Sequence, residues 1–241
     1  MFEQRARGTE ILDRPDGEPA LVRRSYRLMR FVNRAGGGIR AVEEFLEPEL
    51  VNADRGKTVR VLDLGSGDCD IPLAVSRWAR RRGFDVEFLC VDHNDSALDM
   101  ARERIGKSGD GRVKLEKADI FAFRSSRQFD YAVGSMFFHH LTGGQIDTLI
   151  EHLRGFVRRA VLINDLHRDL LNYAACYMLT VGADREIRHD ALLSVRRGFK
   201  ADELRAMLAK HDATARVRRR WFRRIAGVVR FDRTEGEWAL P

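Results

Sequence analysis

Cysteine and long apolar runs are scarce in this 241-residue chain, and each shortage excludes some classes of protein. Three cysteines, Cys69, Cys90 and Cys176, lie far apart without a Cys-x-x-Cys pair, which predicts reduced thiols in a cytoplasmic protein. No run of about 18 apolar residues is present, so no transmembrane helix is expected. The charged N-terminus lacks the apolar core of a signal peptide, so none is expected.

Repeats and low-complexity segments are also absent, and hydrophobic residues make up 44% of the chain, so we expect a packed globular protein. The length suits one α/β domain with modest additions. Lysine and arginine total 43 against 36 acidic residues, a formal net charge of +7. That excess is compatible with anionic substrates, nucleic acid or an anionic membrane surface, and it is too small to decide among them.

Alternating strands and helices from residue 58 onward predict the fold class. The expected strands lie at 59–64, 85–92, 113–118, 129–135 and 160–164, and the intervening helices at 70–82, 95–105 and 145–158. Strands separated by helices imply a parallel sheet with right-handed crossovers. Two further strands, at 213–222 and 225–231, are expected as an antiparallel pair at the sheet edge. The prediction is a Rossmann-like, doubly wound α/β sheet, mostly parallel with a terminal antiparallel strand.

The region before the sheet is expected to form a helical N-terminal cap. We divide the chain into residues 1–57, an irregular arm followed by this cap, and residues 58–241, the main domain. The cap is predicted as helices at 20–34 and 39–50, with the triple glycine at 36–38 breaking the first helix.

A lid-like insertion is expected at about residues 165–200, at the carboxyl edge where ligands bind in such folds. It is predicted as a helix at 168–181 and an irregular stretch at 182–199, with a helix at 201–211 after it, capped by Asp202 or the residue before. The first helix is apolar nearly all round, which predicts burial of two faces, one of them lining an apolar pocket. A core helix or a dimer contact is the alternative.

Residues 59–68 read Val-Arg-Val-Leu-Asp-Leu-Gly-Ser-Gly-Asp, an apolar strand that ends in a Gly-x-Gly loop before a helix. Such a loop brings backbone N–H groups and a helix N-terminus close to a nucleotide-like ligand. The third glycine of the dinucleotide fingerprint is replaced by Asp70, and Asp63 precedes the first glycine. Both disfavour a nicotinamide enzyme, because carboxylates suit a ligand with a positive end, such as S-adenosylmethionine.

Further candidate ligand residues follow the next three strands. Asp92 ends the second strand, where an acidic side chain accepts hydrogen bonds from ribose hydroxyls. Asp119 ends the third, where an adenine amino group could be met, and Gly134 with Ser135 ends the fourth, where backbone must approach a ligand. The alternatives are a tight turn at Gly65 and Gly67, a helix cap at Asp92 and a solvated turn at Asp119. Together the residues are more specific than any one of them, because they fall at the ends of consecutive strands.

On these residues the chain resembles the class I S-adenosylmethionine-dependent methyltransferases over roughly residues 58–165. The matching segments are 61–67 (Val-Leu-Asp-Leu-Gly-Ser-Gly), 91–92 (Val-Asp), 118–120 (Ala-Asp-Ile) and 129–141. A narrower likeness, through residues 32–37, 164–168 and 188–199, is to a bacterial subgroup of small-molecule methyltransferases linked with polyketide or quinone-type pathways. The departure is Asp68-Cys69-Asp70, where many members carry a third glycine.

The resemblance implies S-adenosylmethionine as cofactor and a role for each matched position. The implied cofactor-binding residues are Asp63, Gly65, Ser66 and Gly67 at the methionine end, Asp92 at the ribose, His93 beside the adenine ring, Asp119 and Ile120 around adenine, and Gly134 and Ser135 under the sulfonium.

Histidines are the candidate catalytic residues, because a phenol or hydroxyl acceptor must lose a proton and histidine has an unperturbed pKa of about 6.5. His139 and His140 follow the fourth strand, and adjacent side chains point apart, so only one is expected to face substrate; we favour His139. His167 follows the fifth strand. It could act as a base, bind the substrate or cap a helix. His189 and Asp190 form an oriented pair or a turn.

Two other groups of residues allow either a ligand-binding role or a purely structural one. Asn164, Asp165 and a histidine could supply metal ligands, but their spacing matches no metal motif, so no metal is expected. Residues 216–224 hold six arginines, which suit the solvated face of an edge strand, a carboxylate or phosphate group, an anionic membrane or RNA.

The sequence therefore predicts methyl transfer from S-adenosylmethionine, to oxygen of a small lipophilic, aromatic or polyketide-derived acceptor. The alternatives are an RNA methyltransferase and a non-catalytic cofactor-binding module. No appended RNA-binding module and no Asn/Asp-Pro-Pro-aromatic motif follows the fourth strand, so no stable nucleic-acid partner is expected, while peripheral membrane contact through the arginines stays open. The acceptor, the methylated atom and the oligomeric state stay open as well.

Overall fold

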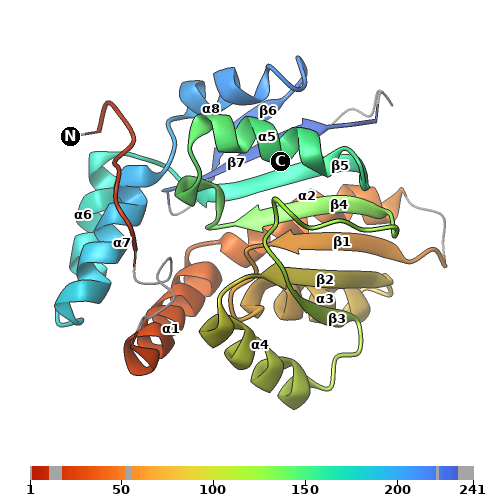
Figure 1. The fold of residues 1–241 in the computed structure, drawn as a ribbon, viewed down its shortest axis with the longest axis horizontal. Coiled ribbons are helices and arrows are strands. Elements are labelled where there is room, and N and C mark those ends of the chain that lie inside the picture. The colour runs from red at the N-terminus through yellow and green to blue at the C-terminus, as the bar shows by residue number, and fades with distance from the viewer. Residues whose placement is uncertain (1, 11–17, 53–55, 221–222, 233–241) are drawn as a thin grey trace.

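The computed structural model describes residues 2–10, 18–52, 56–220 and 223–232 (Figure 1). Seven strands form one sheet in the order β3-β2-β1-β4-β5-β7-β6. They are β1 (Val59–Leu64), β2 (Val86–Asp92), β3 (Val113–Lys117), β4 (Phe129–Ser135), β5 (Val157–Leu166), β6 (Arg216–Arg220) and β7 (Arg224–Arg230). Strands β1 to β5 pair in parallel, and β7 runs antiparallel between β5 and β6. The predicted fold class is confirmed, with the antiparallel strand one place inside the edge.

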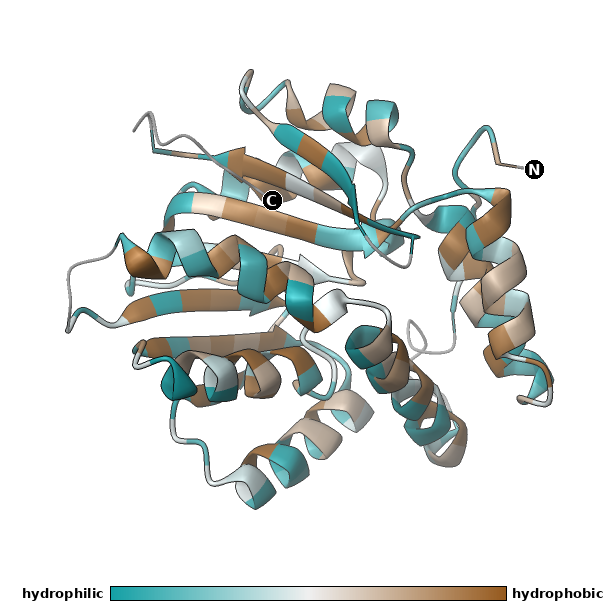
Figure 2. Cartoon of the chain, turned by 180° about the vertical axis from the view of Figure 1, so that it is seen from behind, coloured by the Kyte–Doolittle hydropathy of each residue, from teal (hydrophilic) through white to brown (hydrophobic). Residues whose placement is uncertain are grey.

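Helices cover both faces of the sheet, as a doubly wound fold requires. The helices of the described residues are α1 (Pro19–Ala35), α2 (Gly38–Val51), α3 (Asp70–Arg81), α4 (Asp95–Ser108), α5 (Gly143–Leu153), α6 (Leu170–Leu179), α7 (Arg185–Arg197) and α8 (Ala201–Leu208). One hydrophobic core lies between the sheet and α2, α3 and α4, and the other between the sheet and α5 and α8. The central strands are hydrophobic along most of their length, because both of their faces are buried (Figure 2).

Local capping explains several helix starts. Asn94 accepts a hydrogen bond from the Ala97 N–H to begin α4, and Thr142 forms a capping box with Gln145 to begin α5. Helix α8 instead begins after Lys200, so the predicted cap at Asp202 or the residue before it is wrong. The predicted helix over 145–158 ends early because β5 already starts at Val157.

The insertion differs from its prediction in two ways. Residues 182–199 were expected to be irregular, but most of them form α7. Its buried apolar residues, Ile187, Leu193 and Val195, lie among many charged ones that hide the helical pattern. Helix α6 does not bury two faces. In this fully described helix only Asn172 is buried. Large apolar side chains in and just after α6 are 45% to 69% exposed: Leu170, Leu171, Tyr177, Met178, Leu179 and Val181.

The described part of the expected N-terminal arm, residues 2–10, lies against the insertion as an irregular strap, while residues 11–17 lie outside the described residues. The Ala6 N–H donates to the Arg196 carbonyl at 3.0 Å, and Arg168 donates to the Phe2 and Glu3 carbonyls, both at 3.1 Å. These bonds bring Glu10 into the protein, where it is only 4% exposed. In the described residues, no helix combines the length and the apolar character needed to cross a membrane.

Candidate active site

A crevice of about 290 Å³ lies at the carboxyl ends of β1, β2 and β4. The neighbours β1 and β4 mark the point where the strand order reverses, which is the general ligand position in such sheets. The loop after β1 depends on glycine: Gly65 and Gly67 have φ values of +61° and +54°. A side chain at Gly65 would overlap the Phe137 ring, and one at Gly67 would overlap Tyr26.

Nearly all the residues proposed for the cofactor line this crevice together. They are Asp63, Gly65, Ser66, Gly67, Asp92, His93, Asp119, Ile120 and Ser135. Gly134 is not among the lining residues, and a Cβ there would overlap the Phe138 ring, so its lack of a side chain makes room for Phe138. Ser66 Oγ is buried and has no hydrogen-bond partner among the described residues.

The crevice is strongly acidic. Five aspartates line it, namely Asp63, Asp68, Asp70, Asp92 and Asp119, while no lysine or arginine does so within the described parts of the chain. Burial, then the charges of Asp70 and Asp92, raises the pKa of Asp63 well above its ordinary value. Burial and the charge of Asp68 raise the pKa of Asp70 to about 6. A cationic ligand would relieve this repulsion, whereas a pyrophosphate would add to it.

Asp92 also stabilises the glycine loop after β1. Its Oδ2 accepts from the Gly67 N–H at 2.8 Å, and its Oδ1 accepts from the Asn94 N–H at 2.9 Å. Each carboxylate oxygen retains a second lone pair for a ligand hydroxyl. The ligand role and the structural role are therefore compatible in one side chain.

Helix α1 supplies lining residues that the sequence analysis missed: Tyr26, Met29 and Asn33. Asn33 Nδ2 donates to both carboxylate oxygens of Asp70, at 3.1 and 3.2 Å. Arg30 forms an ion pair with Asp68 at 2.5 Å. The only available signal was polar residues on the buried face of an amphipathic helix, which does not say what they face.

A second cavity of about 390 Å³ lies between α1, α6 and α7. Most of its wall is apolar, including Leu28, Val32, Leu179, Ile187 and Val195, and its polar groups include Glu10, His139, His140, Asn172 and Asp190. The two cavities share four lining residues: Met29, Asn33, Met136 and His140. Met136 has a left-handed backbone with φ of +56°, a conformation that is costly for a residue with a side chain and is often found at functional sites.

His139 is held rigidly at the second cavity. Its Nδ1 lies 2.7 Å from Asp165 Oδ1, and its backbone N–H donates to Asp165 Oδ2 at 3.0 Å. Burial opposes ionisation of Asp165, but the charge and hydrogen bonds of His139 hold the pKa of Asp165 below its ordinary value. A carboxylate on Nδ1 directs the other ring nitrogen, Nε2, toward the cavity side.

The other candidate histidines are placed differently. His140 lines both cavities, and its ring lies 4.1 Å from that of His139, centroid to centroid. Both histidines line the second cavity, so the expectation that only one of them faces it is wrong. His167 lines neither cavity, and its Nδ1 lies 2.6 Å from Asp169, the residue that caps α6. His189 is exposed, while its neighbour Asp190 lines the second cavity.

The remaining groups weighed from the sequence do not form one site. Asn164 donates to the Gly38 carbonyl and to Ser135 Oγ, both at 3.0 Å. The arginines of residues 216–224 divide, because Arg224 is buried while Arg218 and Arg219 are exposed. Residues 221–222 of that run lie outside the described residues.

The sheet order, the glycine loop and the acidic crevice at its switch point define the class I S-adenosylmethionine-dependent methyltransferase fold. Residues 61–160 match a family model described as the methyltransferase domain.

Solved structures with the same fold cover most of the chain. A candidate O-methyltransferase from Nostoc punctiforme matches with a TM-score of 0.65 and 13% identity over 95% of this chain. This chain spans 65% of that protein's length. The plantazolicin methyltransferase in complex with S-adenosylhomocysteine has a TM-score of 0.66 and 12% identity, covering 89% of this chain and 95% of the other. The magnesium protoporphyrin IX methyltransferase from Synechocystis has a TM-score of 0.54 and 12% identity, covering 80% and 82%.

Proposed function

We propose that the chain methylates an oxygen atom of a small lipophilic acceptor, with S-adenosylmethionine in the acidic crevice and the acceptor in the apolar cavity. The observation that carries this proposal is the junction of the two cavities at Met29, Asn33, Met136 and His140. Methyl transfer requires the nucleophile to meet the methyl carbon in line, and such positioning can contribute about 7–11 kcal/mol.

The residues of the acidic crevice suit a cationic adenosyl compound. When bound, S-adenosylmethionine supplies an electrophilic methyl group on a sulfonium. The carboxylates of Asp63 and Asp70 favour its positive end, since both are desolvated and repel each other. Asp92 would accept from ribose hydroxyls, and Asp119 with Ile120 would enclose the adenine.

The apolar cavity favours a lipophilic acceptor. Leu28, Val32, Leu179 and Ile187 offer no hydrogen bonds along most of its wall. The histidine end can receive a hydroxyl, because His140 lies at the junction and His139 is oriented behind it by Asp165. Accepting a proton from the acceptor contributes about 10²–10⁴-fold to the rate in general base catalysis. We therefore propose His139 and His140 as the proton-accepting residues, with His167 outside that group.

The apolar wall supports a small molecule over RNA. An RNA substrate needs basic side chains along its phosphates. No lysine or arginine lines the second cavity within the described parts of the chain. Salt-sensitive binding of RNA by the intact chain would favour the alternative instead.

The test combines cofactor binding with product detection. S-adenosylmethionine and S-adenosylhomocysteine should each raise the melting temperature, whereas NAD should not. Incubation with S-adenosylmethionine and a panel of lipophilic phenols should give an O-methylated product by mass spectrometry. Asp92→Ala should abolish most of the thermal shift, while Asp99→Ala, at an exposed ion pair on α4, should keep it. Equal stabilisation by NAD would contradict the cofactor assignment, and labelled RNA in place of a phenol product would contradict the acceptor class.

A further inference from the structure

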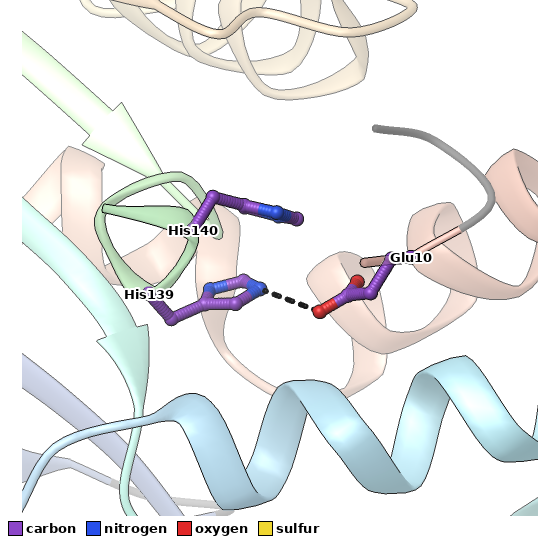
Figure 3. Close-up of side chains that lie close together, drawn as sticks. All are labelled: Glu10, His139 and His140. Atoms are coloured by element: carbon purple, nitrogen blue, oxygen red, sulfur yellow. Dashed lines mark ion pairs between the residues drawn. The ribbon is translucent and has the colours of Figure 1, made fainter. Parts of the chain in front are cut away.

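Three side chains with metal-ligating atoms meet at the polar end of the apolar cavity: Glu10, His139 and His140 (Figure 3). One atom from each lies within 4.8 Å of the others, and Glu10 Oε1 is 3.7 Å from His139 Nε2. Glu10 comes from the N-terminal strap and the histidines from the turn after β4, so the fold gathers ligands from distant parts of the sequence. We propose that these three residues bind one divalent transition-metal ion, such as Zn²⁺.

The surroundings of His139 match those of a metal-ligating histidine. Asp165 lies against Nδ1 at 2.7 Å, and such a carboxylate fixes the tautomer and makes Nε2 the ligating atom. His139 Nε2 is buried and has no hydrogen-bond partner among the described residues, although it faces the Glu10 carboxylate. Ser194 Oγ donates to Glu10 Oε2 at 2.8 Å and leaves Oε1 on the histidine side.

The ligand set indicates the class of ion. Two imidazoles and one carboxylate suit zinc and the neighbouring transition metals better than calcium or magnesium. Zinc–nitrogen and zinc–oxygen bonds are about 2.0–2.2 Å, so two ligand atoms at a tetrahedral angle lie about 3.3–3.6 Å apart. The 3.7 Å between Glu10 Oε1 and His139 Nε2 is close to that separation. Three protein ligands leave a fourth position open. That position would face the apolar cavity, because all three residues line it.

Arg197 already contacts the Glu10 oxygen that a metal ion would bind. Its Nη1 lies 3.2 Å from Glu10 Oε1, and its Nε and Nη2 donate to the carbonyls of His139 and His140. A metal ion would have to take over Oε1 from this guanidinium. Two bonds to backbone carbonyls would still hold Arg197 in place, so binding requires displacement of one contact.

Metal binding is measured on the full untagged chain after dialysis against EDTA. Calorimetric titration with Zn²⁺ and the absorption spectrum with Co²⁺ should each show one saturable site with nitrogen and oxygen ligands. Glu10→Gln and His140→Gln should each lose this site, and Asp165→Asn should weaken it about 10–100-fold. His189→Gln, at an exposed histidine on α7, and Cys176→Ser should leave it unchanged.

The proposal is overturned if no saturable binding is found, or if binding survives His140→Gln. A thiolate-to-cobalt band that disappears in Cys176→Ser also overturns it, since it moves the ion elsewhere. An unchanged far-ultraviolet circular dichroism spectrum and an unchanged urea unfolding midpoint show that each variant is folded. A bound ion would occupy the lone pairs of His139 and His140, so these residues can accept a proton only in the metal-free protein. Turnover of the phenol panel by metal-free protein would therefore support the proposed function whether or not an ion binds.

Discussion

The guanidinium of Arg224 donates from Nη2 to Asn33 Oδ1 at 2.7 Å, which joins strand β7 to helix α1. Asn33 in turn donates to both oxygens of Asp70 at the cofactor crevice. Arg224 is only 1% exposed, its Nη1 has no hydrogen-bond partner among the described residues, and burial lowers its pKa to about 10. A buried charge with so few partners costs stability, so we infer that it serves to orient Asn33.

Arg224→Met tests that positioning role. The substitution removes a costly buried charge, so the free energy of unfolding in urea should stay the same or rise. The affinity for S-adenosylmethionine should fall about 10-fold, because Asn33 no longer holds Asp70. Arg218→Met, at an exposed site on β6, serves as the matched control. Unchanged cofactor affinity in Arg224→Met would contradict the role.

Gly67 and Tyr26 should show strong coupling in a double-mutant cycle. Gly67→Ala places a methyl group against the Tyr26 ring in a left-handed backbone, so cofactor binding should be lost. Tyr26→Ala removes the overlap, and the double variant should regain part of the binding, with a residual backbone penalty of about 1 kcal/mol. Gly144→Ala, where no atom lies near the added carbon, is the control. Additive effects on calorimetric affinity would contradict the contact.

The raised pKa of Asp70 predicts that the stability of the folded protein depends on pH. Because its pKa rises from 3.8 to about 6 on folding, the unfolded chain releases this proton at lower pH than the folded protein. The stability of the ligand-free protein therefore falls as pH rises between about 4 and 6, by about 3 kcal/mol in total, and this contribution is constant above that window. The difference between the urea unfolding curves of wild type and Asp70→Asn should follow this trend. A difference that grows in the opposite direction would contradict it.

The same titration affects ligand binding. A cationic ligand prefers the ionised Asp70, so the affinity for S-adenosylmethionine should rise with pH up to about 6, more steeply than in Asp70→Asn. Calorimetry at several pH values checks this, with the urea measurement as the independent comparison.

Ala191 tests the acceptor cavity separately from the crevice. Ala191→Phe places a ring in the wall of the second cavity, so turnover of bulky acceptors should fall at least 10-fold while the thermal shift with S-adenosylhomocysteine stays the same. Ala174→Phe, an exposed site on α6 outside the cavity lining, should retain turnover. Equal loss in both variants would place the acceptor elsewhere.

Parallel strand ends explain why much of the crevice was predictable. Asp63, Asp92 and Asp119 lie at or just after the ends of β1, β2 and β3, and the carboxyl ends of parallel strands meet at one edge. Tyr26 and Asn33 were not predictable, because helical periodicity gives the buried face of α1 but not its partner. Glu10 lies in a segment without periodicity, and only hydrogen bonds from distant residues bring it to His139.

The contacts of the histidine side chains could not be predicted from the sequence either. Their positions after β4 and β5 predicted nearness to the site, but His167 turns to Asp169 while His139 turns to Asp165. Which carboxylate each ring contacts depends on the path of the chain beyond the strand. The exposed apolar face of α6 likewise shows that hydrophobicity alone does not decide burial.

A crystal structure of the complex with S-adenosylhomocysteine tests the central claim most directly. The account predicts the ribose at Asp92 and the sulfur at the junction formed by Met29, Asn33, Met136 and His140, facing the apolar cavity. A ligand bound with its sulfur turned away from that junction, or outside the acidic crevice, would contradict the account.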